Sequence, residues 1–413
     1  MAKKSGISTL MGGDSWIWGI YYMLALASIT VMGSASSRLA YSDITNDNVM
    51  RAHTMDLIIW FFVCICGVQS LTRANIKWVK WGGVLGYIGG TIAMASLRIV
   101  GTESRGAYRT LFGVQPVEIA KIGLILLICM LVAAKDEPIN LLVTKVRQEN
   151  RKYWTMLALI GVTAGAIALQ NMSSAIIVVL ASFVVMFAGE VRGKYLRWTV
   201  VATLVAGTLA VAALFGLHEL NVSQEAGGHR HHTSLGVLDR ANTWEYRIFH
   251  GDEVPLWEQS LNDDNMQVLS AHMAIANSNG IGRFAGNSMM RDYLPEAYSD
   301  YVYAIIFEEY GIVGAAVIML LYLLLFWRCY RISLHTTNRT MRLMMIGLPA
   351  MIVIQALIHM GVCTDAMFVT GQPLPLVSKG GMSVAGTSAC FGILLGISHV
   401  IRKEEENRMR NEE

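Results

Sequence analysis

The chain has 413 residues, of which 54% are hydrophobic and only 15% are charged. Soluble globular chains carry about 25% charged residues, so the composition excludes an ordinary soluble protein and indicates a chain with many membrane spans. The formal net charge of +3 is too small to support nucleic-acid binding.

Ten apolar stretches are long enough to cross a bilayer, which takes roughly 17–25 mostly apolar residues. They are Ser15–Gly33, Thr54–Leu71, Val79–Leu97, Val117–Ala134, Tyr153–Leu169, Ser173–Gly189, Trp198–Leu217, Tyr301–Trp327, Leu343–Cys363 and Ser383–Ile401. Only Gln170, Asn171 and Met172 separate the fifth stretch from the sixth, which predicts a tight helical hairpin. The predicted fold is an all-α polytopic membrane protein, a single membrane domain over residues 1–413 with about ten transmembrane helices.

Lysine and arginine fall mainly in alternate connecting segments. Cytoplasmic loops are enriched in these residues, and most of the 33 basic residues lie on one side if both termini are cytoplasmic. Residues 1–14 and 402–413 are then cytoplasmic, and residues 218–300 form one large external loop that includes short helices. The basic inner segment Lys135–Lys152 is expected to be a surface helix on anionic lipid.

The most informative stretch is Leu294–Asp300, which runs into an apolar span that contains Glu308 and Glu309. Carboxylates at or inside a membrane span are costly, and such residues usually serve a function. Asp300 is therefore the first candidate for a functional residue. The alternative is that Asp300 only caps the helix that starts at Tyr301, since Asp is a favoured N-cap residue.

A second polar cluster lies between Arg98 and Lys121. Glu118 and Lys121 are three residues apart, so they fall on one helical face and can pair. Pro116 suits the first turn of that helix. One interpretation is a structural ion pair that allows two charges to enter lipid. The other is a basic site, with Arg109 nearby, for a lipid diphosphate.

A third cluster, Thr370–Ser383, contains two prolines and three glycines before the last span. Irregular backbone at membrane depth is tolerated where it lines a cavity or packs inside protein. Lys379 precedes Gly380 and Gly381, so it could meet an anion at the start of a helix.

Four motifs in this order resemble the SEDS family of shape, elongation, division and sporulation proteins, the FtsW and RodA polymerases of peptidoglycan. Gln115–Lys121 is similar to the family's Q-P-S-E-x-x-K, and Leu294–Asp300 to L-P-E-x-x-[TS]-D. Glu308–Gly311 is similar to E-E-x-G, and Gly371–Gly381 to G-x-x-L-P-x-x-S-Y-G-G. The resemblance covers about residues 16–402, and the Pro-Glu-Ala before Asp300 and the short tail resemble the division-type branch.

The resemblance implies a glycosyltransferase that polymerises lipid II into β-1,4 glycan strands at the outer membrane face during cell division. Asp300 would be the general base. The implied substrate-binding residues are Arg51, Arg109, Glu118, Lys121, Gln267, Glu296, Ser378 and Lys379. A divalent cation, Mg²⁺ or Mn²⁺, could help to neutralise the diphosphate, and no other cofactor is implied.

The implied location is the bacterial inner membrane at the division septum. The implied partners are lipid II, the nascent glycan strand, other divisome membrane proteins and a class B penicillin-binding protein, which by analogy would contact the eighth and ninth spans. Two alternatives stay open, namely a lipid II flippase and a non-catalytic scaffold for the transpeptidase. Asn171, His359, Lys379 and Met382 depart from the family pattern, which puts fine substrate contacts in doubt.

Overall fold

The computed structural model describes residues 12–35, 49–208 with short gaps, 266–294, 297–367 and 371–412. Glu296 and most of the predicted external loop therefore lie outside the described residues. So do Arg51 and Arg109 as side chains, although their backbone is described within a helix and a strand.

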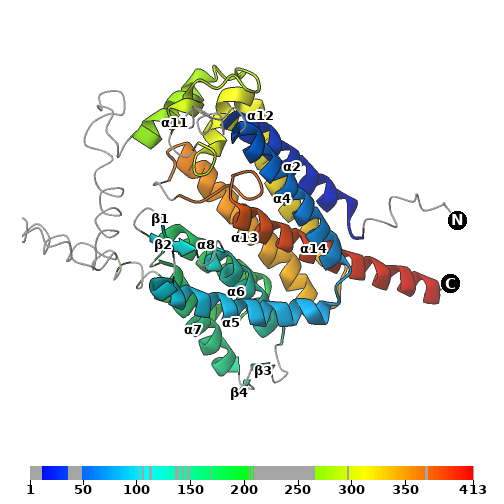
Figure 1. The fold of residues 1–413 in the computed structure, drawn as a ribbon. Helices are drawn as coiled ribbons and strands as arrows, with labels where there is room; N and C mark the ends of the chain where they lie inside the picture. Colours follow the sequence, from blue (N-terminus) through cyan, green and yellow to red (C-terminus); the bar gives the residue numbers. More distant parts are fainter. Residues whose placement is uncertain are drawn as a thin grey trace, which may run out of the picture.

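Long helices make up the bundle drawn in Figure 1. They are α2 (Ser15–Ala35), α4 (Val49–Thr72), α5 (Ile76–Val100), α6 (Pro116–Ala133), α7 (Glu149–Ala168), α8 (Met172–Ala188), α12 (Val302–Ser333), α13 (Arg339–Cys363) and α14 (Gly381–Glu412). They match nine predicted spans, and residues 193–203 are helical at the start of the remaining one. Over the described residues, five helices are long and apolar enough to cross a membrane. The polytopic helical class is confirmed, and the count of ten stays a prediction.

Short elements fill the connections. They are β1 (Thr102–Ser104), β2 (Ala107–Thr110), β3 (Ile139–Leu141), β4 (Thr144–Val146), α11 (Met266–Asn277) and the 3₁₀ turn η2 (Met290–Asp292). The strands form two antiparallel hairpins, β1–β2 and β3–β4. The prediction of a surface helix is therefore wrong for residues 139–141 and 144–146, whereas residues 149–152 are helical at the start of α7. Pro138 has no backbone N–H to offer a helix, and β-branched Thr144 and Val146 favour strand.

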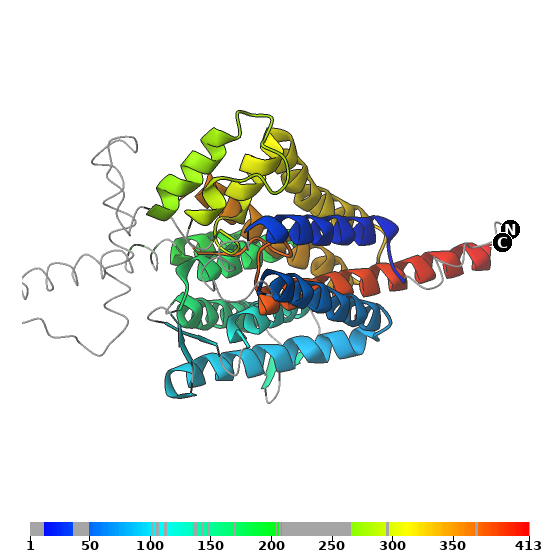
Figure 2. The same ribbon diagram turned by 45° about the horizontal axis from the view of Figure 1, so that its top comes forward.

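The two ends of α2 are tied to α12, which runs antiparallel to it. At one end Arg328 of α12 donates to both carboxylate oxygens of Asp14, at 3.1 and 2.6 Å. At the other end Ser34 donates to Glu309. The backbone N–H of Asp14 also donates to the hydroxyl of Ser398 at 3.0 Å, so the start of α2 lies beside the C-terminal half of α14. That half continues out of the bundle (Figure 2).

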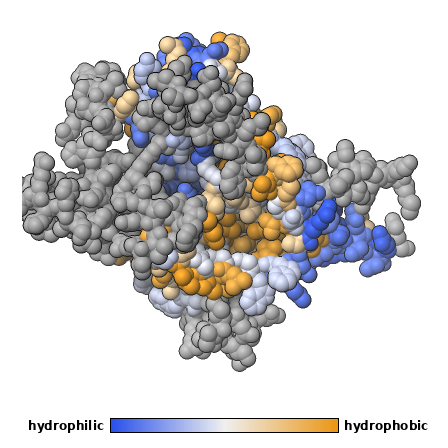
Figure 3. Space-filling view, in the orientation of Figure 1, coloured by the Kyte–Doolittle hydropathy of each residue, from blue (hydrophilic) through white to orange (hydrophobic). Residues whose placement is uncertain are grey.

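The outer surface of the bundle is apolar. On α5, the exposed fractions of Trp78, Leu85 and Ile92 are 74%, 61% and 64%. Figure 3 shows apolar side chains along the flank of the bundle, whereas polar side chains gather at the end of α14. Large apolar side chains facing outward over several helices are what a lipid environment requires, and a soluble monomer would not expose so many.

The segment before Asp300 is fastened to a kink in α12, and we call residues 280–290 with Glu308–Gly311 the α12 clamp. Gly311 has φ of 65°, which favours glycine, and breaks the helical backbone. The N–H groups of Arg283 and Phe284 donate to the carbonyls of Glu308 and Glu309, each at 2.8 Å. These bonds fix the chain just before it returns to the start of α12.

Candidate functional site

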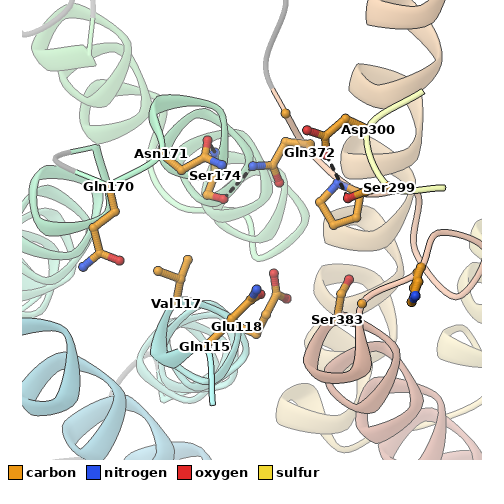
Figure 4. A pocket seen from close by; sticks show the side chains of 14 residues that line it. Gln115, Val117, Glu118, Gln170, Asn171, Ser174, Ser299, Asp300, Gln372 and Ser383 are labelled. Atoms are coloured by element: carbon orange, nitrogen blue, oxygen red, sulfur yellow. Dashed lines mark hydrogen bonds between the residues drawn. The ribbon is translucent and has the colours of Figure 1, made fainter. Parts of the chain in front are cut away.

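Several chain segments meet around a polar cavity (Figure 4). Its lining residues are Gln115, Val117, Glu118, Gln170, Asn171, Ser174, Ser299, Asp300, Gly371, Gln372, Pro373, Lys379, Gly380 and Ser383. They come from the start of α6, the α7–α8 turn, the residues before α12 and the loop that leads into α14. The tertiary structure thus brings three of the four motifs to one place.

Three helices begin at this cavity, because the first turns of α6, α8 and α14 all contribute lining residues. A helix N-terminus carries a partial positive charge and favours anions. Asn171 caps α8, since its side chain accepts from the N–H groups of Ser173 and Ser174 at 3.1 and 3.4 Å. Asn171, one of the departures from the family pattern, therefore fixes the start of α8 at the cavity.

Asp300 lies half-buried on the cavity wall. The hydroxyl of Ser299 donates to Asp300 Oδ1 at 3.0 Å. The N-cap position of α12 is occupied by Tyr301, and no side chain caps the helix there, so the geometry gives the capping alternative no support. Gly371 lies against Asp300 with φ of 59°, and a Cβ at that position would approach Asp300 Oδ2 to 3.3 Å. Only glycine suits both the backbone and the contact.

Glu118 and Lys121 form the predicted ion pair, with 2.8 Å between Lys121 Nζ and Glu118 Oε1. Lys121 is fully buried and also donates to Gln355 Oε1 on α13 at 3.2 Å. Glu118 lines the cavity, whereas Lys121 is not among the lining residues. Lys121 therefore lies behind Glu118 and fixes its carboxylate, and it would act on a substrate through Glu118.

The loop before α14 is held to the residues around Asp300. The hydroxyl of Ser378 donates to the carbonyl of Ser299 at 2.7 Å and accepts from the N–H of Leu374 at 2.8 Å. The N–H of Lys379 donates to the carbonyl of Tyr298 at 2.9 Å, and the ammonium of Lys379 lies 5.1 Å from the centre of the Tyr298 ring. Ser378 thus braces the loop, and Lys379 brings a cation to the cavity wall.

The same loop is fixed to α13 on its other side. Gln355 Nε2 donates to the carbonyl of Pro373 at 3.0 Å. His359 Nδ1 donates to the carbonyl of Gln372 at 2.6 Å, so His359, a departure from the family pattern, supports the loop from within the bundle. The backbone of the loop is therefore set by buried side chains rather than by solvent.

Some predicted site residues lie elsewhere. Gln267 is at the start of α11, and no residue of α11 lines the cavity. Sequence reasoning also passed over several lining residues, namely Gln115, Gln170, Ser174, Gln372 and Ser383. The available signal was that uncharged polar side chains recur at the starts of apolar helices, where the absence of charge makes them easy to miss.

Glu308 and Glu309 are sealed inside the α12 clamp, with exposed fractions of 0% and 1%. The carboxylate of Glu308 accepts from the hydroxyl of Ser288 and from the N–H groups of Met289 and Met290. Glu309 accepts from Ser34. These two acids therefore join chain segments, and neither lines the cavity where Asp300 and Glu118 meet.

The fold and the site define a multi-pass membrane protein with a polar cavity built where helix N-termini and two carboxylates converge. The profile of a family described as "Cell cycle protein", comprising FtsW, RodA and SpoVE, matches residues 15–403. The chain belongs to this family, and the resemblance inferred from the motifs is confirmed.

Individual relatives agree with this assignment. The chain is 28% identical over 366 residues to a probable peptidoglycan glycosyltransferase FtsW of Tolumonas auensis, covering 84% of this chain and 85% of the relative. It is 27% identical to the protein of the same name in Geobacter metallireducens, with 72% of each chain covered. It is 35% identical over 147 residues to stage V sporulation protein E of Bacillus subtilis, covering 35% of this chain and 40% of the relative.

Solved structures share the fold. RodA of Thermus thermophilus superposes with a TM-score of 0.59 at 20% identity, covering 94% of this chain and 96% of that chain. A chain from the structure named "Structural coordination of polymerization and crosslinking by a peptidoglycan synthase complex" superposes with a TM-score of 0.66 at 19% identity, covering 94% of this chain and 98% of that chain.

Proposed function

We propose that this protein is a peptidoglycan glycosyltransferase that polymerises lipid II into β-1,4 glycan strands during cell division, with Asp300 as the general base. The observation that carries the proposal is the meeting of Asp300, Glu118 and Lys379 at one cavity formed by three helix starts. Family membership and the names of the FtsW relatives support the reaction class.

The proposed reaction is a displacement at the anomeric carbon of a sugar joined to lipid diphosphate. Asp300 takes the proton of the acceptor 4-hydroxyl, whose oxygen forms the new glycosidic bond. The bond to the diphosphate oxygen breaks, and the lipid diphosphate leaves, so the α linkage of the donor becomes β. A positioned base of this kind contributes about 10²–10⁴-fold to a rate.

The leaving diphosphate needs positive charge where its own negative charge develops. Lys379 and the starts of α6, α8 and α14 supply that charge at the cavity. Glu118 places a negative charge beside them, which its ion pair with Lys121 compensates. The described residues contain no group of three or more His, Cys, Asp or Glu side chains suited to a metal. Diphosphate oxygens would be among the ligands of a Mg²⁺ or Mn²⁺ ion at this site.

The proposed topology places the cavity at the outer face of the cytoplasmic membrane, with ten spans, both termini in the cytoplasm and the protein at the septum. The link between the start of α2 and the C-terminal half of α14 supports placing both ends on one side. The excess of Lys and Arg in the inner segments supports the cytoplasmic assignment.

The proposed partner is a class B penicillin-binding protein with one membrane span, since a structural neighbour comes from a synthase complex that couples polymerization to crosslinking. The eighth and ninth spans, which by analogy would contact this partner, are α12 and α13. Of these two helices, α12 offers the better docking surface. Ile312 and Val313 of α12 are 58% and 72% exposed, whereas 89% of the most apolar stretch of α13 is buried inside the bundle.

The test is polymerisation of labelled lipid II by the purified protein, co-expressed with its cognate transpeptidase. Wild type should produce long glycan strands, and a folded Asp300→Ala variant should produce none. Movement of lipid II across vesicles without any glycan product would indicate a flippase instead. Activity that survives in Asp300→Ala would remove Asp300 from the chemistry.

A further inference from the structure

Three polar side chains on the cavity wall have buried oxygens without a hydrogen-bond partner among the described residues. These atoms are Gln170 Oε1, Gln372 Oε1 and Ser383 Oγ. Gln372 and Ser383 are each only 3% exposed, so both are almost completely removed from solvent. Because nearly all buried polar groups in folded proteins are paired, these oxygens call for a specific explanation.

Gln372 cannot relieve its unpaired oxygen by turning away. Its Nε2 donates to the hydroxyl of Ser174 at 2.9 Å. The backbone carbonyl of Gln372 accepts from His359 Nδ1 at 2.6 Å, so the backbone is fixed as well. Figure 4 shows the side chain of Gln372 reaching across the cavity from the loop to α8, with Ser383 pointing in from α14. The free oxygen is therefore held at the space that a ligand would occupy.

The chemistry of these atoms defines the ligand group. An amide oxygen accepts from an O–H or N–H, and a serine hydroxyl can donate or accept. Neither group is charged, so they differ from the Lys379 ammonium and the helix N-termini that suit a diphosphate. A neutral group that offers a donor and an acceptor side by side, such as an acetamido or a ring hydroxyl, would satisfy both oxygens.

We propose that Gln372 and Ser383 form a sugar subsite that binds the N-acetylated disaccharide of the lipid-linked substrate, separately from its diphosphate. The identity of the sugar follows from the proposed function, on which the inference rests in this respect. It adds that recognition of the sugar depends on uncharged side chains between Asp300 and Glu118. Without the sugar the Gln372 oxygen would remain unpaired, and a site of this kind rejects ligands that lack the matching group.

The experiment compares two lipids that share the diphosphate. One is undecaprenyl diphosphate, and the other is the same lipid carrying the N-acetylated disaccharide without a peptide. Dissociation constants are measured for the full-length protein in nanodiscs. Wild type should bind the disaccharide lipid more tightly. Gln372→Met should reduce that preference about tenfold, the effect of one hydrogen bond to a buried acceptor, and leave undecaprenyl diphosphate binding unchanged.

Two further variants make the outcome interpretable. Gln69→Met makes the same substitution on α4, away from the cavity, and should keep the full preference. Ser383→Ala removes only one hydroxyl and should reduce the preference about fivefold, which keeps the test valid if Gln372→Met does not fold. An equal loss for both lipids, or a preference that persists in Gln372→Met and Ser383→Ala, would overturn the subsite.

The subsite and the proposed reaction can fail independently. Polymerisation of lipid II is measured on the same preparations. A wild type that makes no glycan but loses its sugar preference in Gln372→Met would retain the subsite and refute the polymerase. A wild type that polymerises while Gln372→Met and Ser383→Ala bind both lipids as wild type does would retain the polymerase and refute the subsite.

Discussion

The cavity and the α12 clamp both contain acidic motif residues, yet their carboxylates have different surroundings. Asp300 and Glu118 line the cavity, where part of each residue faces open space. Glu308, a few residues beyond Asp300, is fully buried and accepts from Ser288, Met289 and Met290. The comparison shows that an acid close to a membrane span can either face a cavity or join buried chain segments.

The difference follows from what surrounds each carboxylate. In the clamp, backbone N–H groups and a hydroxyl compensate for the removal of Glu308 from water, as a buried charge requires. At the cavity, three helix starts and Lys379 provide a field that suits a ligand's charge. Variants of Asp300 and Glu308 should therefore differ, with activity lost at Asp300 and stability lost at Glu308.

The largest effect on activity is expected for Asp300→Asn, which keeps the shape of the side chain but cannot take a proton. Polymerisation of lipid II should fall at least about 100-fold, because a general base contributes 10² or more. The thermal unfolding midpoint should stay close to that of wild type. Near-normal glycan synthesis by Asp300→Asn would place the base elsewhere and make Asp300 a structural residue like those of the clamp.

Lys121→Met should give the largest loss of stability. It leaves Glu118 partly buried without its cation, and breaking a buried pair from one side costs about 3–5 kcal/mol. Adding Glu118→Gln should recover most of that free energy of unfolding but not the activity, since Glu118 lines the cavity. The check is unfolding in detergent for both single variants and the double variant. A Lys121→Met protein as stable as wild type would show that the pair has no structural role.

Glu308→Ala should destabilise the protein by about 3 kcal/mol, because several donors in the clamp lose a charged acceptor. Activity per folded molecule should remain within severalfold of wild type, in contrast to Asp300→Asn. The measurements are the unfolding midpoint and the rate normalised to folded protein. A folded Glu308→Ala protein with no activity would show that Glu308 is needed for the reaction. The cavity and the clamp would then not differ in function as proposed.

The smallest effect is expected at the cap of α8. Asn171→Ala removes the acceptor for the N–H groups of Ser173 and Ser174 and should cost about 1 kcal/mol. Asn171→Asp keeps the cap and adds a negative charge at the helix N-terminus, so it should be at least as stable as wild type. A comparable loss of stability in Asn171→Asp would show that added negative charge at the cavity outweighs the cap.

Local patterns predicted the helices and the pairs within them. The run of apolar residues located α6, Pro116 marked its first turn, and the spacing of Glu118 and Lys121 predicted their ion pair, which the structure contains. The hairpin of α7 and α8 followed from its short polar connection. The basic segment before α7 was misjudged because charge alone does not determine helix, and β-branched residues such as Ile139, Thr144 and Val146 favour the strands found there.

Contacts between distant segments could not be predicted in this way. Asp300, Glu308 and Glu309 look alike in sequence, and only the fold separates a cavity wall from a sealed clamp. Lys121 looked like a ligand for phosphate, but Gln355, far along the chain, holds its ammonium away from the cavity. Gln372 carried no charge to mark it, and its role depends on Ser174 and His359 from other helices.

The sequence by itself determined the membrane class, most helix positions and the family, because these depend on composition, on apolar length and on motifs a few residues long. The tertiary structure decided which polar side chains share a cavity and which satisfy one another. Tertiary packing determines this, because whether a buried polar atom has a hydrogen-bond partner depends on groups that the fold brings from elsewhere in the chain. The carboxylate of Glu308 has its hydrogen-bond partners within the protein, whereas the amide oxygen of Gln372 has none among the described residues and is proposed to bind a ligand.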